Sequence, residues 1–177
     1  MIGYSCMSTH SLISSLYQYK AWANEALFAK LEAIDPVQHE AERHNVMRIL
    51  NHIYVVDRIF AAHLTGTGHG YTGTNTPDTP ALGALREAVK DSDKWYVKYS
   101  AQLDADQLAQ AIEFTFTDGK PGRMTREEML AHVVTHGGYH RGAVGRILSQ
   151  LAIQPPAEVF TGFLHQTQPQ RRGSARF

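Results

Sequence analysis

Histidines are the residues of this chain whose type and spacing could do chemistry. Three of them, His132, His136 and His140, follow one another at four-residue steps in the segment HVVTHGGYHRG. On a helix, each such step advances about 6 Å along the axis and turns about 40°, so neighbouring histidines of this row can hold one metal ion. His132 and His140 would lie about 12 Å apart, so only one adjacent pair can form the clamp.

A helical wheel indicates which pair faces the protein interior. The apolar residues of this segment centre roughly 50° from His136 on one side, and His140 lies near that centre. His132 lies about 90° from the centre, at the edge of the apolar face. We therefore predict that His136 and His140 form the inward pair. The apolar residues are Met129, Val133, Val144, Ile147 and Leu151.

Open metal sites commonly have three protein ligands and a bound water, so a third ligand is expected. His52 is the best candidate, because isoleucines and a valine at helical spacing place it on the apolar face of another segment. One buried histidine alone is more commonly a hydrogen-bonded core residue than a ligand. Three inward histidines on two helices favour an ion, which satisfies several ring nitrogens together. His63 shares the face of His52 but lies roughly 16 Å from it.

We therefore predict one divalent transition metal ion per chain, held by His52, His136 and His140. Imidazole ligands suit zinc or nickel, and iron or copper are the alternatives. Three carboxylates are candidate fourth ligands, although each is more typical of a helix cap or of the surface. They are Asp57, Glu25 and Glu128.

Four amphipathic segments must position these histidines. In each of them apolar residues recur at three- and four-residue steps, which predicts a helix. Thr125 and Glu128 form a capping box at the start of the last helix, and Asp104 opens a short helical turn before it. The four long helices are expected at residues 11–34, 46–65, 80–101 and 125–151.

Two connections interrupt this helical pattern. Residues 65–80 are rich in Gly, Thr, Asn and Pro, which predicts one long loop. About fifteen extended residues reach roughly 45 Å, while a twenty-residue helix is about 30 Å long, so this loop could cross over along the whole bundle. Residues 113–124 place β-forming residues on both sides of Asp118-Gly119, which predicts a small β-hairpin.

An all-α four-helix bundle is the simplest way to bury four apolar stripes, and 177 residues suit one domain covering residues 1–177. Residues 1–7 and 166–177 are expected to be flexible. Gly138, Gly142 and Gly145 lie opposite the inward histidines, where glycine costs about 1 kcal/mol of helix propensity. A close contact with a neighbouring helix or a second subunit would explain them.

Composition argues against several function classes. Seventeen basic residues balance seventeen acidic ones, so no net field draws the chain to nucleic acid or to an anionic membrane. The N-terminal segment lacks the features of a secretory signal, and no stretch is apolar enough to span a bilayer. The single cysteine, Cys6, excludes an internal disulfide and suits a reducing compartment. We expect a cytoplasmic protein that binds neither nucleic acid nor membrane.

Three segments resemble the DinB family, also called the DinB/YfiT-like metalloenzymes. YKAWANEALFAKL is similar to the YxxWANxxLL opening of that family, and ILNHIYVVDRIF surrounds its first histidine. EEMLAHVVTHGGYHRGAVGRILSQL is similar to its L-x-H-x-x-x-H-x-x-x-HRGQ signature. The resemblance implies a bundle in up-down-down-up order, with the second loop as the crossover and with the metal on His52, His136 and His140.

The same resemblance implies a homodimer and a metal-dependent enzyme. Some branches of the family transfer or isomerise substrates with low-molecular-weight thiols such as bacillithiol, mycothiol or glutathione. We therefore expect a thiol S-transferase-like activity, with a metal-dependent hydrolase, or a non-catalytic metal-stabilised dimer that binds a small molecule, as alternatives. The chain departs from the family pattern at Ala143, where Gln is usual, and at Glu158-Val159, where Asp-Leu is common.

Overall fold

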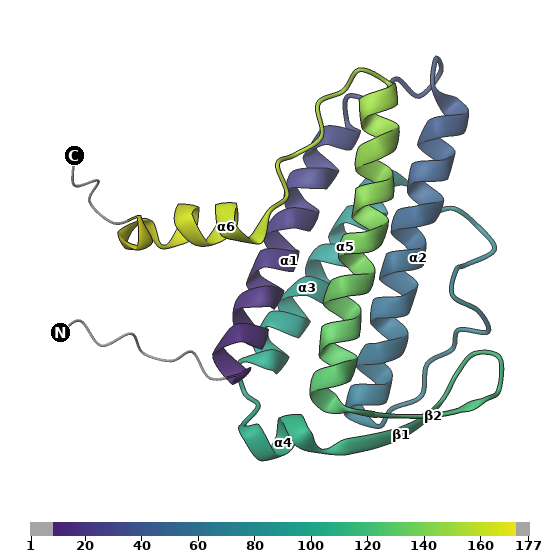
Figure 1. Cartoon of the computed structure of the whole chain (residues 1–177). Coiled ribbons are helices and arrows are strands. Elements are labelled where there is room, and N and C mark those ends of the chain that lie inside the picture. Colours follow the sequence, from purple (N-terminus) through teal and green to yellow (C-terminus); the bar gives the residue numbers. More distant parts are fainter. Residues whose placement is uncertain (1–8, 173–177) are drawn as a thin grey trace.

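The computed structural model describes residues 9–172, which consist mainly of helices together with one β-hairpin (Figure 1). The four long segments expected from the sequence are helical. Shorter elements follow the third and the fourth of them. The long helices are α1 (Thr9–Leu31), α2 (Glu40–Thr65), α3 (Leu82–Ser100) and α5 (Arg126–Gln150). The other elements are α4 (Ala105–Ala109), β1 (Ala111–Thr115), β2 (Pro121–Thr125), α6 (Phe160–Thr167) and the 3-10 helix η1 (Pro169–Arg171).

Helix ends follow the signals in the sequence. Gly66 ends α2 in the left-handed region, at φ 67°, where glycine has no Cβ to clash. The predicted capping box at α5 is confirmed, since Thr125 accepts from the Glu128 backbone and the Glu128 carboxylate accepts from the Thr125 backbone. Asp104 caps α4 in the same way.

The predicted β-hairpin is confirmed. β1 and β2 are antiparallel, with Ala111 opposite Thr125 and Thr115 opposite Pro121. Gly119 takes φ 85° in the turn, as the Asp-Gly signal requires. Phe114 of β1 is buried among apolar residues of the helices, so this small sheet closes one end of the helical core.

Contacts between the long helices form a closed circuit. α1 packs against α3 and α5, and α2 packs against the same two helices. Their apolar residues form two clusters: one reaches the hairpin end and includes Tyr17, Phe60 and Met129, and the other includes Leu27, Leu50 and Leu148. All four long helices contribute residues to both clusters.

The loop between α2 and α3 runs back along α2. Its first residues contact the end of α2, where Thr67 donates to the Ala62 carbonyl. Further on, Arg48 donates to the Thr76 carbonyl at 2.6 Å, close to the start of α2. The loop therefore covers α2 over most of its length, as Figure 1 shows on the right of the molecule.

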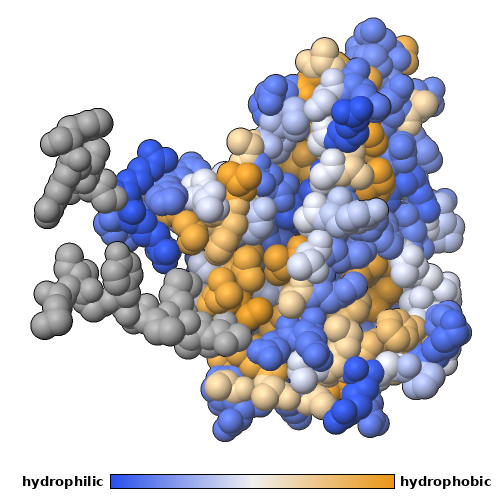
Figure 2. Space-filling view, in the orientation of Figure 1, coloured by the Kyte–Doolittle hydropathy of each residue, from blue (hydrophilic) through white to orange (hydrophobic). Residues whose placement is uncertain are grey.

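The C-terminal segment differs from the prediction. Residues 166–172 were expected to be flexible, but α6 extends to Thr167 and η1 follows at Pro169–Arg171. The other residues expected to be flexible, 1–7 and 173–177, lie outside the described residues. Phe160 and Phe163 of α6 pack with Tyr19 and Trp22 of α1, which gives this helix an anchor. Figure 2 shows hydrophobic residues gathered where α6 meets the long helices.

The close contact with a neighbouring helix predicted for three glycines of α5 is not found within residues 9–172. A Cβ at Gly142 would meet nothing within 4 Å, and at Gly145 it would meet only Pro155 at 3.6 Å. At Gly138 it would meet only the Arg141 side chain. The crowded position is Gly137, whose Cβ would lie 3.0 Å from Arg141 Nη1.

No helix within residues 9–172 combines the length and the apolar character needed to cross a membrane.

Candidate metal centre

Three imidazoles from two helices converge between α2 and α5. His52 comes from α2, and His136 and His140 come from successive turns of α5. One ring nitrogen from each histidine can be chosen so that all three lie within 4.8 Å of one another. The ring centroids are 4.5 to 4.9 Å apart. This group could hold a metal ion, and it is the group named from the sequence.

The crossover loop fixes the orientation of His52. Its Nδ1 lies 2.7 Å from the Thr74 carbonyl oxygen, which can only accept, so Nδ1 carries the proton. The lone pair of a neutral His52 is then on Nε2, and this atom lies 3.1 Å from His136 Nε2. A backbone carbonyl that holds the far nitrogen of a ligand is the usual support for a metal-binding imidazole.

Burial keeps two of the three imidazoles neutral. The pKa of His136 is lowered to about 3, mainly by burial and further by the neighbouring His140 and His52. Burial also lowers the pKa of His140, with a further contribution from His52. A neutral imidazole has a free lone pair, so at neutral pH these groups are in the form that binds metals.

The donor set fits a transition metal ion. Nitrogens bound tetrahedrally at about 2.0–2.1 Å lie about 3.3 Å apart, close to the 3.1 Å between His52 Nε2 and His136 Nε2. Without an ion, a hydrogen bond between His52 Nε2 and His136 Nε2 requires a proton on one of these two atoms. The fit rests on the Nε2 atoms of His52 and His136. The buried His136 Nδ1 has no hydrogen-bond partner among the described residues, and an ion on Nε2 would not supply one.

Other histidines named from the sequence lie beside this group rather than in it. His132 stacks on His136, with centroids 5.4 Å apart, and also contacts Phe60. His63 contacts Phe114 and the loop residue His69. Neither joins the three histidines as a potential ligand.

The three candidate carboxylate ligands have other partners. Asp57 is buried and accepts from Lys20, Glu25 pairs with Arg86, and Glu128 caps α5. None of them joins the three histidines in the part of the chain that the structure describes. A fourth ligand from these residues is therefore not supported.

A buried charge network lies close to the three histidines and was not expected from the sequence. Lys20 of α1 is fully buried and lies 2.7 Å from Asp57 of α2 and 2.7 Å from Asp93 of α3. Asn24 donates to the second oxygen of Asp93. These side chains separate the two apolar clusters. A signal existed, because each charged residue lies on the apolar face of its helix.

Arg141 continues this network on α5. It directly follows His140, it is buried, and it donates to Asn24 at 3.2 Å and to Glu158 at 2.6 Å. Glu158 also accepts from Tyr19. The departure from the family pattern at position 158 therefore keeps a carboxylate, which here binds the arginine of the HRG segment.

Gly137 separates the network from the histidines. It follows His136 and has no side chain, and a Cβ there would lie 3.7 Å from Lys20 Cε and 3.9 Å from Ile53 Cγ2. The α5 turn that carries His136 and His140 is thus packed directly against the charge network. The network fixes the backbone on one side, and the imidazoles face the other.

Comparisons with known proteins show the family of the chain. The family model described as "DinB family" matches residues 7–172. Protein DinB of Bacillus subtilis (strain 168) is 25% identical over 150 residues, which cover 76% of this chain and 83% of that protein. The family match spans both helices that bear the histidines. The chain belongs to the DinB family.

Proposed function

We propose that this protein is a metal-dependent enzyme that holds one divalent transition metal ion, zinc or nickel first, on His52, His136 and His140. The observation that carries the proposal is the convergence of three ring nitrogens within 4.8 Å, from helices far apart in sequence. Membership of the DinB family supports the same reading.

A bound divalent ion would lower the pKa of a coordinated thiol or water and so supply an anionic nucleophile at neutral pH. Other residues of the chain position the three histidines for this chemistry. Thr74 orients His52 through Nδ1, and the packing around Gly137 fixes the α5 turn. All three histidines are partly exposed, so a small molecule could reach them from solvent.

Transfer to or from a low-molecular-weight thiol is the favoured reaction, with hydrolysis as the alternative that the same site would serve. A purely structural ion would be closed by four protein ligands. Among residues 9–172 only three donors converge, which favours an open coordination position and hence catalysis. This supports an enzyme over a non-catalytic bundle that binds a small molecule.

The proposal also includes the helix topology, the oligomeric state and the location of the protein. The circuit of contacts among α1, α3, α2 and α5, with a loop that returns along α2, supports an up-down-down-up four-helix bundle. We further propose a homodimer located in the cytoplasm, where low-molecular-weight thiols are reduced.

Elemental analysis of the tag-free protein tests the metal site. We expect one ion per chain in the wild type and none after His52→Ala, His136→Ala or His140→Ala. His132→Ala is the matched control, because His132 lies on the same row of α5 but outside the three-histidine group, and it should keep its ion. Absence of an ion from the wild type after metal supplementation, or equal loss in His132→Ala, would contradict the assignment.

A cobalt-substituted sample then separates the two reactions. Addition of bacillithiol or glutathione should produce a thiolate-to-cobalt charge-transfer band if the thiol binds the metal. The band should be absent with the corresponding S-methyl thioether, which cannot ionise. A cobalt protein whose spectrum does not change with any of these thiols would contradict the thiol proposal and leave hydrolysis as the better reading.

A further inference from the structure

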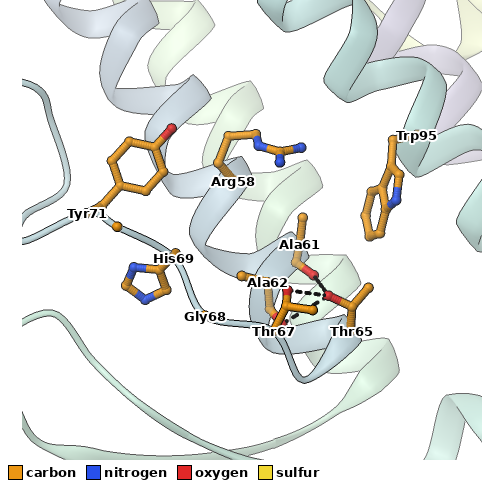
Figure 3. A pocket seen from close by; sticks show the side chains of 10 residues that line it. Arg58, Ala61, Ala62, Thr65, Thr67, Gly68, His69, Tyr71 and Trp95 are labelled. Carbon is orange, nitrogen blue, oxygen red and sulfur yellow. Dashed lines mark hydrogen bonds between the residues drawn. The ribbon is translucent and has the colours of Figure 1, made fainter.

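A cavity lies on a different face of α2 from the three histidines. It has a volume of about 590 Å³, within the range of small-molecule sites, and is bounded by the end of α2, the start of the crossover loop and α3. Figure 3 shows its lining side chains. Arg58 follows His52 by six residues, which on a helix places the two about 120° apart around the axis. The cavity is therefore separate from the metal centre.

Its lining carries positive charge without negative charge. Arg58 belongs to the lining, and none of the ten residues that form it is acidic. Arg58 forms no ion pair with a carboxylate among residues 9–172, whereas Arg86 and Arg141 each do. In Figure 3 its guanidinium extends between Tyr71 and Trp95. An unpaired guanidinium in a cavity is a ready partner for a carboxylate or phosphate.

The C-terminal end of α2 would ordinarily repel an anion here, because helix ends carry exposed carbonyl groups. Those carbonyls are already occupied. Thr65 donates to the Ala61 and Ala62 carbonyls, and Arg126 donates to the Leu64 carbonyl at 2.7 Å. The negative end of the helix is thus neutralised beside the cavity.

Aromatic side chains supply a flat apolar wall. Trp95 lines the cavity and is supported from behind by Tyr99, with ring centroids 4.7 Å apart and planes inclined by 14°. Tyr71 and His69 form the loop side, with centroids 6.3 Å apart. The His69 ring also packs against His63, with centroids 5.2 Å apart, and its buried Nδ1 has no hydrogen-bond partner among the described residues.

We propose that this cavity is a second ligand site, which binds a small organic anion that carries an aromatic ring. The carboxylate or phosphate pairs with Arg58, and the ring packs against the indole of Trp95. The site is independent of the metal, because no histidine of the three-histidine group lines it. The occupant is a free small molecule, and the two anionic groups are distinguished by the experiment.

The indole N–H signals of the full-length protein provide a direct readout in a ¹H–¹⁵N correlation spectrum. The chain has two tryptophans, and Trp22→Phe identifies the signal of Trp95. Phenylacetate and phenyl phosphate are titrated as probes, with neutral phenylacetamide and inorganic phosphate as controls. We expect saturable shifts of the Trp95 signal with the two aromatic anions, and none with either control at the same concentrations.

Arg58→Gln tests the charge, and Arg146→Gln is the matched control, because it removes an exposed arginine of α5 away from the cavity. We expect Arg58→Gln to weaken binding of both aromatic anions by about tenfold or more, with Arg146→Gln unchanged. Arg58→Lys, which keeps the charge but loses the planar fork, should weaken it less. Binding should be equal in metal-free and metal-loaded protein.

Tighter binding of phenyl phosphate than of phenylacetate would identify a phosphate-bearing ligand, and the reverse order a carboxylate; both support the site. An unshifted Trp95 signal with both aromatic anions would overturn the proposal. Equal binding of phenylacetamide would also overturn it, and this comparison in the wild type depends on no variant. Loss of the metal centre would leave all these results unchanged.

Discussion

The three histidines and the buried charge network lie close together, next to Gly137, and they differ in the partners of their polar groups. The network encloses Lys20, Asp57, Asp93 and Arg141. Lys20 bridges the two aspartates, and Asn24 joins Asp93 to Arg141, while Asp57 Oδ1 has no hydrogen-bond partner among the described residues. The histidines are only partly buried, and no carboxylate of the described residues joins them. In one region opposite charges contact each other, and in the other three ring nitrogens converge in a group that could hold an ion.

This difference separates the residues that hold the fold from those that can bind a ligand. Buried opposite charges stabilise each other and are costly to separate. Partly exposed neutral imidazoles contribute little to stability, so they are available for chemistry. A side-chain change should therefore affect folding in the network and metal binding in the histidine group, with little overlap.

Loss of the central cation should have the largest effect on stability. Lys20→Met keeps the length of the side chain but leaves two buried carboxylates facing each other. We expect the free energy of unfolding to fall by about 3–5 kcal/mol, measured by urea denaturation of metal-free protein. His52→Ala, measured in the same way, should change it by no more than about 1 kcal/mol. A comparable loss in both variants would break the distinction between the regions.

The next largest expected effect is a dependence of the free energy of unfolding on pH, caused by Asp57 of the network. Burial, only partly opposed by Lys20, raises the pKa of Asp57 from 3.8 to about 6. Between these values the folded protein binds a proton that the unfolded chain releases. The contribution of Asp57 is therefore fully present below about pH 4 and is lost as the pH rises to about 6, by on the order of 2–3 kcal/mol.

Denaturation of wild type and Asp57→Asn across this pH range checks that sign. The amide cannot ionise, so the stability difference between the two proteins should change with pH as stated. His136 acts in the opposite direction, because its pKa is lowered and its contribution is lost as the pH falls. It is common to both proteins and cancels in the difference. Parallel stability curves would show that Asp57 does not titrate there.

The smallest expected effects on stability come from substitutions at two glycines of α5. Gly137→Ala should destabilise the protein, because the new Cβ would crowd Arg141 Nη1 at 3.0 Å. Gly142→Ala meets nothing within 4 Å and should stabilise the monomer by about 0.5–1 kcal/mol through helix propensity. Thermal unfolding of both variants measures the contrast. If Gly142 lies in a dimer interface, Gly142→Ala would instead shift sedimentation towards the monomer.

Local signals in the sequence predicted most of the secondary structure. The periodic apolar residues, Gly66 after α2 and the Thr125 capping box predict the long helices and their ends, and the hairpin follows from its Asp-Gly turn. The three histidines were predictable from two signals: helix spacing limits the α5 ligands to one adjacent pair, and the apolar faces of the two helices indicate His136, His140 and His52. Helix α6 was missed because it is short and contains Gly162, and its stability comes from Trp22 and Tyr19 of another helix.

The charge network could not be predicted in the same way. Lys20 and Asp57 each stand on an apolar face, which signals that they need partners, but the sequence does not say which. Which charged residues form ion pairs depends on how far the helices are shifted along one another, and the packing of the whole core sets that shift. The hydrogen bond between His52 and the Thr74 carbonyl could not be predicted either, because every residue has a backbone carbonyl and the sequence does not show which one lies near His52.

The separation of 84 residues between His52 and His136 also has a consequence for the order of events in folding. The histidines of α5 leave the ribosome long after α2, so an ion cannot template the first half of the chain. Contacts of such long range form late and slowly. Metal capture would therefore report that α2 and α5 have already come together, and the rate of metal uptake by refolding protein would time that step.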